Sequence, residues 1–124
     1  MTKGDPIPTP SRLVHEPARL SILTVLSSCA SADFVFLQRT TGLSKGNLSV
    51  QLSNLAEAGL INLSREIVDK KTLTTASLSE RGVAEMKEYW HVMDEIRAHS
   101  SACETRLVNR ARRRANLEIQ SQRA

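Results

Sequence analysis

The clearest hydrophobic pattern in the chain lies between Ser44 and Gly59, where leucines alternate with short polar residues. Leu48, Leu52 and Leu55 recur at the spacing that lines one face of an α-helix. Ser44 has the side chain of an N-cap, and Gly59 can end the helix in the left-handed conformation that glycine adopts readily. The pattern therefore predicts a helix over 44–59 that turns a leucine face towards a core.

The opposite face of this predicted helix is polar and carries no acidic residue before Glu57. A solvated helix ordinarily carries Glu and Lys at spacings that allow ion pairs, so this composition needs an explanation. Hydroxyl and carboxamide side chains can contact base edges in a DNA major groove, where Asn and Gln can bond adenine in two places. The alternative is a plain amphipathic helix, and the neighbouring segments have to decide between the two.

Two segments before Ser44 predict further helices. The first runs from about residue 16 to 28, with Pro17 in a first turn where its missing N–H costs nothing. The second begins at 32 or 33 and ends at Gly42. The second of these helices, a short turn containing Gly42 and the helix over 44–59 follow one another at the spacing of a helix-turn-helix. Any small helical hairpin would share that spacing.

The periodicity changes after Gly59. Two runs rich in Leu, Ile, Val and Thr, 60–68 and 73–78, flank the polar sequence Asp69-Lys70-Lys71-Thr72. This pattern predicts a β-hairpin with a basic tip. Beside a DNA-binding helix, such a tip can reach phosphates or the minor groove, whereas elsewhere it would be a solvated turn.

The segment GLSKGNLSVQLSNLAEAGLI, together with the helices before it and the hairpin and LSERG sequence after it, resembles the winged helix-turn-helix regulators of the MarR and ArsR type. The resemblance implies a mainly α fold with a small β-hairpin: a winged helix-turn-helix with a long C-terminal dimerisation helix. It also implies a dimeric DNA-binding transcription factor. The residues that the resemblance places against DNA are Ser44, Lys45, Asn47, Ser49, Val50 and Gln51. The polar helix surface adds Asn54, and the hairpin tip adds Lys70 and Lys71.

Two features depart from the pattern of these regulators. The glycine and arginines usual in the wing are replaced by Asp69, Lys70 and Lys71, and an aromatic residue often found near the last strand is Ala76. Because Asp69 places an acid at the tip, we expect this wing to insert less strongly into the minor groove than the wings of relatives.

A long amphipathic helix is predicted after the hairpin. Apolar residues recur at steps of three and four from Val83 through Trp90, and the stripe resumes near Leu107. A helix of about 30 residues measures about 45 Å, which is more than one small domain can cover, so part of its apolar face should pack on a second copy. We therefore expect a homodimer whose recognition helices address an inverted repeat with half-sites about 10 base pairs apart.

Composition adds limits to this interpretation. The length of 124 residues and 40% hydrophobic content suit one globular unit, and no apolar run suggests a membrane span or a secretory signal, so we expect a soluble cytoplasmic protein with no membrane association. The net charge of +4 is uneven, since residues 1–104 carry 11 Lys and Arg against 12 Asp and Glu, whereas residues 105–124 carry six Arg against one Glu. Attraction for DNA must then come from local placement of lysines such as Lys45.

These observations divide the chain into four segments: an extended proline-rich arm over 1–12, a winged helix-turn-helix DNA-binding domain over 13–78, a dimerisation helix over 79–111 and a basic tail over 112–124. A disordered or solubilising tail is favoured over a helical extension. The predicted function is that of a sequence-specific regulator of transcription on double-stranded DNA, expected to be a repressor. A small-molecule effector that changed the angle between the C-terminal helices would release DNA, and the sequence does not identify one.

A metal-responsive sensor is one alternative. Imidazole, carboxylate and thiolate groups recur at four-residue steps on the C-terminal helix and are all zinc ligands, but one helix rarely supplies a closed coordination shell. We therefore expect no metal or other cofactor. The candidate ligands are His91, Glu95, His99 and Cys103.

Other functional classes fit the sequence less well. It contains no glycine-rich phosphate loop, GxSxG or HExxH motif, so an enzyme is not expected. A winged helix that binds protein instead of DNA is the stronger rival, but it would present an apolar or acidic outer face over 44–59. The four aromatic residues are too few for the stacking surfaces that bind single-stranded RNA.

Overall fold

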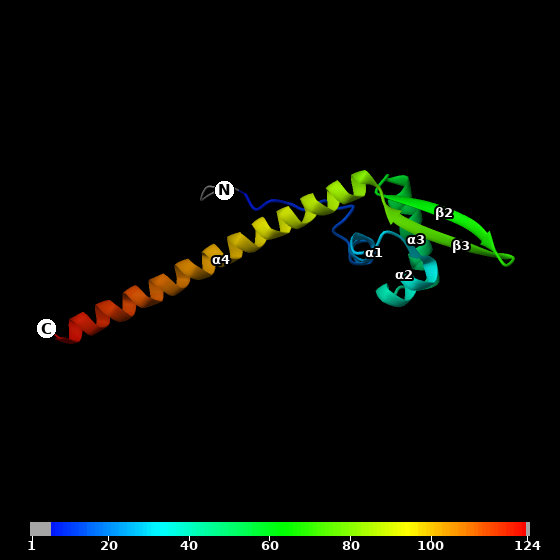
Figure 1. Ribbon diagram of the computed structural model, residues 1–124. Coiled ribbons are helices and arrows are strands. Elements are labelled where there is room, and N and C mark those ends of the chain that lie inside the picture. Colours follow the sequence, from blue (N-terminus) through cyan, green and yellow to red (C-terminus); the bar gives the residue numbers. More distant parts are fainter. Residues whose placement is uncertain (1–5, 124) are drawn as a thin grey trace. The chain divides into compact units, whose positions relative to one another are not determined.

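The computed structural model describes the backbone of residues 6–123 and their side chains except those of 101–106 and 120–123. The chain forms two compact units: Pro10–Trp90 is the larger, and the described residues before Pro10 and after Trp90 belong to the other. The order of elements is α1 (Pro17–Ser27), β1 (Ala32–Asp33), α2 (Phe34–Thr41), α3 (Lys45–Glu57), β2 (Ile61–Val68), β3 (Lys71–Leu78) and α4 (Glu80–Arg123) (Figure 1). The predicted class, mainly α with a small β-hairpin, is confirmed.

The first two helices begin and end at their capping residues. The Glu16 carboxylate accepts two backbone N–H groups of the first turn of α1, at 3.2 and 2.8 Å, and Pro17 follows it. Asp33 caps α2 in the same way, and Gly42 ends this helix with a φ of 73°. Both predicted helices are therefore present, but the second starts at Phe34 and not at 32 or 33, because those two residues form β1.

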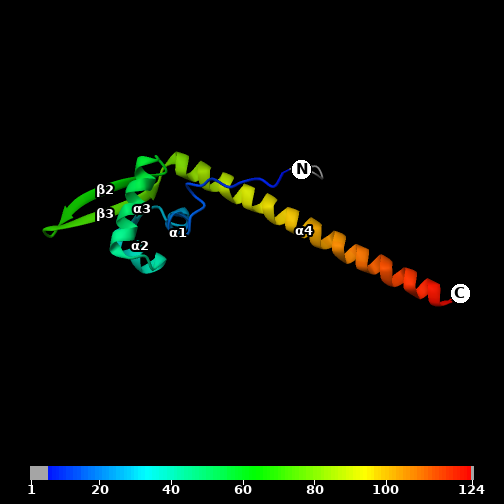
Figure 2. The same cartoon turned by 180° about the vertical axis from the view of Figure 1, so that it is seen from behind.

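Helix α3 also follows its sequence signals. Ser44 accepts the N–H of Asn47 at 3.1 Å as the N-cap, and Gly59 lies just beyond the helix with a φ of 81°. The three leucines of the predicted stripe are buried. Helix α3 lies against α1 and β2 (Figure 2).

The sheet contains a strand that the sequence pattern did not predict. β1 pairs with β3, so the strand order is β1-β3-β2, and Ala76 lies opposite both Ala32 and Leu63. Two residues are too few to show the alternation of a strand, and Asp33 also serves as the N-cap of α2. The sequence pattern therefore indicated only the helix at this point. Ala76 is buried on the central strand of this small sheet.

The turn of the hairpin is shorter than predicted. Val68 pairs with Lys71 and Ile67 with Thr72, so the four-residue tip predicted over 69–72 is wrong and only Asp69 and Lys70 connect the strands. Both have positive φ, 50° and 64°, as a type I′ turn requires. Such a turn matches the right-handed twist of the strands, which favours the shorter loop.

The core of the larger unit draws on every helix. Its largest fully buried side chains come mainly from α1, α2 and α3, and the start of α4 adds Met86 and Tyr89. The beginning of α4 is therefore part of this unit, which extends past the boundary expected after residue 78. These largest fully buried side chains are Val14, Ile22, Leu23, Leu26, Leu37, Leu48, Leu55 and Leu60.

Helix α4 continues to Arg123, so the expectation that the helix ends near residue 111 before a non-helical tail is wrong. The sequence after 111 is rich in Arg, Ala, Leu and Gln and has neither Gly nor Pro, and these helix formers outweigh the repulsion among the arginines. In the predicted N-terminal arm, residues 6–11 form neither helix nor strand, and residues 1–5 lie outside the described part. Along 6–123, none of the helices combines the length and apolar character needed to cross a membrane.

A tight joint connects the end of α3, the base of the sheet and the start of α4. The Ser79 hydroxyl donates to the carbonyl of Gly59 at 2.6 Å and accepts the N–H of Gly82 at 3.0 Å. A Cβ at Gly82 would lie 2.0 Å from the carbonyl oxygen of Leu60, so only glycine fits. Arg81 adds a hydrogen bond to the carbonyl of Ala58. These contacts hold α3 and the hairpin at one place in the domain.

Candidate nucleic-acid interface

The face of α3 opposite its leucines is open to solvent. Of the residues predicted to contact DNA, those from this segment are exposed except Gln51, which is half-buried. Lys45 gives this face a positive charge, and Glu57, the last residue of the helix, is its first acid. The exposed members are Ser44, Lys45, Asn47, Ser49, Val50 and Asn54.

One exposed apolar side chain interrupts this polar face. Val50 is 56% exposed, although a residue of this kind is ordinarily placed in a core. An apolar side chain on a surface that enters a major groove can contact the methyl group of thymine. Val50 therefore adds a type of contact that the hydroxyl and amide groups around it cannot make.

The N-terminal end of α3 is also accessible. A Cβ at Gly46 would meet no atom within 4 Å. The hydroxyl of Ser44 is occupied as the N-cap, where it accepts the N–H of Asn47. The partial positive charge of a helix N-terminus favours an anion at this end, and Lys45 adds to that attraction.

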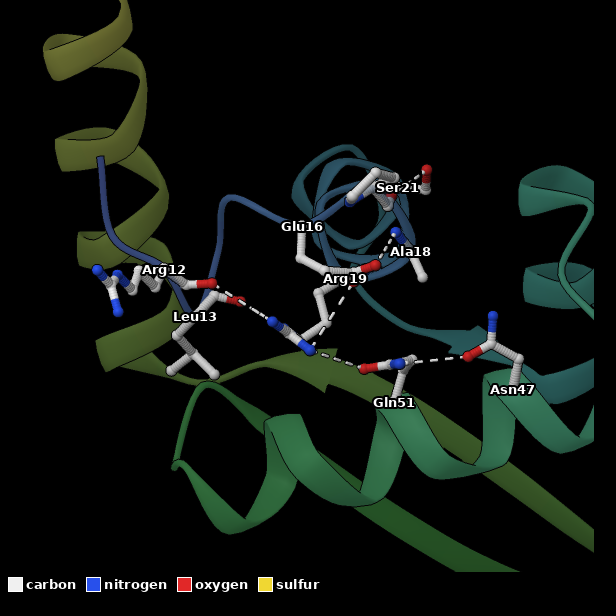
Figure 3. Close-up of polar contacts among 9 residues, drawn as sticks. Arg12, Leu13, Glu16, Ala18, Arg19, Ser21, Asn47 and Gln51 are labelled. Carbon is white, nitrogen blue, oxygen red and sulfur yellow. Dashed lines mark hydrogen bonds and ion pairs between the residues drawn. The ribbon is translucent and has the colours of Figure 1, made fainter. Parts of the chain in front are cut away.

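Arg19 is a residue of the site that the sequence analysis missed. It lies on α1, and its guanidinium donates to Oε1 of Gln51 at 3.1 Å (Figure 3). Gln51 in turn donates from Nε2 to Oδ1 of Asn47 at 3.2 Å. Arg19 is the one charged residue in the sequence of α1, and a lone charge on an apolar helix was the feature of the sequence that could have marked it as a candidate. Its partner could not be inferred, because Gln51 lies 32 positions further along the chain.

Arg19 is itself fixed by the chain before α1. Its Nε donates to the carbonyl of Leu13 at 2.6 Å and its Nη2 to the carbonyl of Arg12 at 3.3 Å. The carboxylate of Glu16 lies 3.8 Å from Nη1. The backbone N–H of Arg19, which Glu16 accepts as the cap of α1, is the main reason that the pKa of Glu16 lies below its ordinary value of 4.5.

The hairpin supplies the two other predicted DNA contacts. Lys70 is in the turn, Lys71 is the first residue of β3, and both are exposed. The outer half of the hairpin extends away from α1, α2 and α3 (Figure 1), and its apolar residue Ile67 is 82% exposed. This part of the hairpin is therefore free to contact a ligand.

The side chain of His15, which precedes α1, lies against Tyr89 of α4. Its Nδ1 lies 2.9 Å from the hydroxyl oxygen of Tyr89, within hydrogen-bonding distance, and the two rings lie 5.8 Å apart between centroids. This contact attaches the start of α1 to α4 within the larger unit.

The proposed metal ligands on α4 are brought together only in part. Nε2 of His91 lies 2.8 Å from a carboxylate oxygen of Glu95, and Nε2 of His99 is buried without a hydrogen-bond partner among the described residues. The side chain of Cys103 lies outside the described part. Among the side chains that are described, no group of three or more His, Cys, Asp or Glu residues could hold a metal ion.

Comparisons with known proteins agree with this geometry. The model of a family described as a winged helix DNA-binding domain matches residues 18–97, which is more than half of the chain. No protein in a curated set matches. This is a family of DNA-binding domains and not of enzymes.

Several solved structures share the fold. A transcriptional regulator homologue from Pyrococcus horikoshii OT3 is 24% identical over 75% of this chain and 89% of its own, with a TM-score of 0.61. The YusO protein of Bacillus subtilis is 18% identical, with coverages of 86% and 76% and a TM-score of 0.66. A MarR family regulator from Silicibacter pomeroyi is 22% identical, with coverages of 78% and 73% and a TM-score of 0.55. On the extent of the family match, the chain belongs to the family of winged helix DNA-binding domains.

Proposed function

We propose that this protein regulates transcription by binding a specific sequence of double-stranded DNA through the outer face of α3. The observation that carries the proposal is an exposed, polar helix face with no acid before Glu57, in a winged helix domain. Its small side chains permit close approach to a major groove, and its hydroxyls and amides can bond base edges. An acidic or apolar face would instead have favoured a protein partner.

Two groups of residues divide the work in this proposal. Asn47, Ser49 and Gln51 contact base edges and supply sequence preference, while Lys45 and the wing lysines contact phosphates and position the domain. The wing lysines are Lys70 and Lys71. Because phosphates are the same in every sequence, loss of a lysine should weaken binding to all sequences alike.

The proposed DNA-binding form is a homodimer joined through α4. Large apolar side chains remain exposed on the later part of this helix, where Leu107 is 61% and Leu117 is 65% exposed. Covering such residues with a second copy would remove them from water. Two recognition helices related by a twofold axis would then bind an inverted repeat with half-sites about 10 base pairs apart.

The dimer is tested by sedimentation of the full chain. Leu107→Asp should shift the protein from dimer towards monomer, because a carboxylate would be buried in the contact. Asn109→Asp adds the same group two positions away on the same exposed segment and serves as the control. A wild-type chain that is monomeric at micromolar concentration would contradict this part of the proposal.

The DNA-binding proposal is tested by selecting bound sequences from random duplex DNA at low ionic strength. The wild type should enrich an inverted repeat. Asn47→Ala and Gln51→Ala should relax base preference at individual positions, by about 1–3 kcal/mol each. Lys70→Ala should weaken all sequences alike and lower the dependence of log Kd on log salt by about 1.

Failure of this test would have a clear form. A wild-type chain that binds no duplex under these conditions would reject the proposed function and leave the protein-binding winged helix as the explanation.

The repressor role is tested separately, with a reporter whose promoter overlaps the selected sequence. Expression should fall when the wild type is present and should recover with Asn47→Ala, because a bound dimer would block access to the promoter.

A further inference from the structure

A row of hydrogen bonds runs from the body of the domain onto the recognition helix. Arg19 of α1 donates to Gln51, and Gln51 donates to Asn47, one turn earlier on α3 (Figure 3). The Arg19 side chain is only 20% exposed. The row therefore connects a largely covered arginine to two residues proposed to contact bases.

The arginine decides the direction of each hydrogen bond in this row. A guanidinium has N–H donors and no acceptor, whereas a carboxamide has an acceptor oxygen and a donor amino group. Gln51 must therefore turn its oxygen towards Arg19, which directs its amino group to Asn47. Asn47 must then offer its oxygen to Gln51, and both N–H groups of its Nδ2 are left for other partners.

Arg19 is built to hold this arrangement and not to bind phosphate. Two backbone carbonyls, of Leu13 and Arg12, accept from its guanidinium, and Glu16 lies beside it. Together with Gln51 these carbonyls take three of its five N–H donors, and the Glu16 carboxylate offsets its charge. Arg19 is thus suited to positioning Gln51.

We propose that Arg19 helps to determine which base the protein prefers, without touching DNA, by making the Gln51–Asn47 pair present N–H donors to the major groove. A guanine edge offers two adjacent acceptors, N7 and O6, whereas an adenine edge combines an acceptor with a donor. A two-point adenine contact by Gln51 would have to use the second lone pair of Oε1 and the second N–H of Nε2, while the bonds to Arg19 and Asn47 fix the direction of this amide. The inference, which rests on the proposed function, therefore favours guanine over adenine at the base facing Asn47 and revises the expectation that these amides bond adenine.

The test is a double-mutant cycle read out as base preference. Wild type, Arg19→Met, Gln51→Ala and the double variant are compared on the selected duplex with guanine or adenine at each contacted position. The wild type should prefer guanine by about tenfold at the base facing Asn47, and Arg19→Met should remove most of this preference. In the Gln51→Ala background, Arg19→Met should have no further effect, because the link is already broken.

Arg39→Met is the matched control. Arg39 is an exposed arginine in the last turn of α2, so its loss removes the same charge without touching the row. It should weaken guanine and adenine duplexes alike and leave the preference unchanged. A merely structural or electrostatic role of Arg19 would likewise leave base preference unaltered.

The outcomes separate the inference from the function on which it rests. If Arg19→Met does not fold, Gln51→Ala alone decides, because it breaks the row and leaves the bonds of Arg19 to Leu13 and Arg12 in place. A wild-type preference for adenine at this base, or an unchanged guanine preference in both single variants, overturns the inference while DNA binding stands. A wild type that enriches no duplex at all rejects the proposed function itself.

Discussion

The recognition helix and the wing offer two different surfaces. The outer face of α3 stands on three buried leucines, begins at an N-cap, and has amides already engaged in hydrogen bonds. The outer half of the hairpin has an exposed turn and exposed side chains on both strands. Orientation matters for contacts to base edges and matters little for attraction between a lysine and a phosphate. The outer face of α3, whose amides are held by hydrogen bonds, therefore suits sequence recognition. The tip of the hairpin suits electrostatic positioning.

The largest expected effect comes from the joint that holds both surfaces. Gly82→Ala would place a methyl group 2.0 Å from the carbonyl oxygen of Leu60, so α4 and the base of the sheet would have to separate. We expect a loss of about 2–4 kcal/mol in the free energy of unfolding, measured by denaturant titration. DNA binding by α3 and by the wing should fall together. An unchanged midpoint of unfolding would show that the joint is not a support for the two surfaces.

Gly46→Ala should separate folding from binding on the recognition helix. Space around Gly46 is open, so alanine should stabilise the helix by about 0.5–1 kcal/mol through its higher helix propensity. DNA affinity should nevertheless fall, because the added methyl group stands where the helix approaches the groove. Unfolding and duplex binding are measured on the same preparation. A gain in stability without loss of affinity would place the DNA contact elsewhere on the domain.

Two substitutions of Lys70 should separate charge from backbone conformation in the wing. Lys70 has a φ of 64°, which glycine adopts more easily than alanine or lysine. Lys70→Gly should therefore stabilise the fold by about 1 kcal/mol, whereas Lys70→Ala should not. Both should lower the salt dependence of DNA binding equally, since each removes the same charge. Different salt slopes for the two variants would mean that the shape of the turn, and not only its charge, contributes to binding.

The smallest expected effect concerns pH and the support of Arg19. The pKa of Glu16 is lowered in the folded chain, so its carboxylate stabilises the fold above its ordinary pKa of 4.5, and this contribution is lost as the pH falls through the lower folded value. Glu16→Gln should flatten the decline of stability below pH 4.5 and cost less than about 1 kcal/mol at pH 7. Unfolding midpoints between pH 7 and about 3 provide the measurement. Glu57→Gln, which removes an exposed charge from the end of α3, is the control.

Local signals in the sequence determined much of this protein. The leucine stripe of α3, the caps Ser44 and Asp33 and the glycines that end α2 and α3 act over a few residues, so their effect could be inferred without knowing the fold. The resemblance of the central segment to winged helix regulators agrees with the family match. The course of α4 beyond residue 111 was also a local property, and it was missed because the arginines were interpreted as a solvated tail although most of their neighbours favour a helix.

Tertiary structure alone decided the remaining features. The pairing of Ala32 with Ala76 joins residues distant in the chain, and a strand of two residues has no period of its own. Gly82 has no room for a side chain only because the carbonyl of Leu60 lies against it. The direction of the Gln51 amide depends on an arginine of another helix. In each case the deciding atom comes from elsewhere in the chain, so no local pattern could contain it.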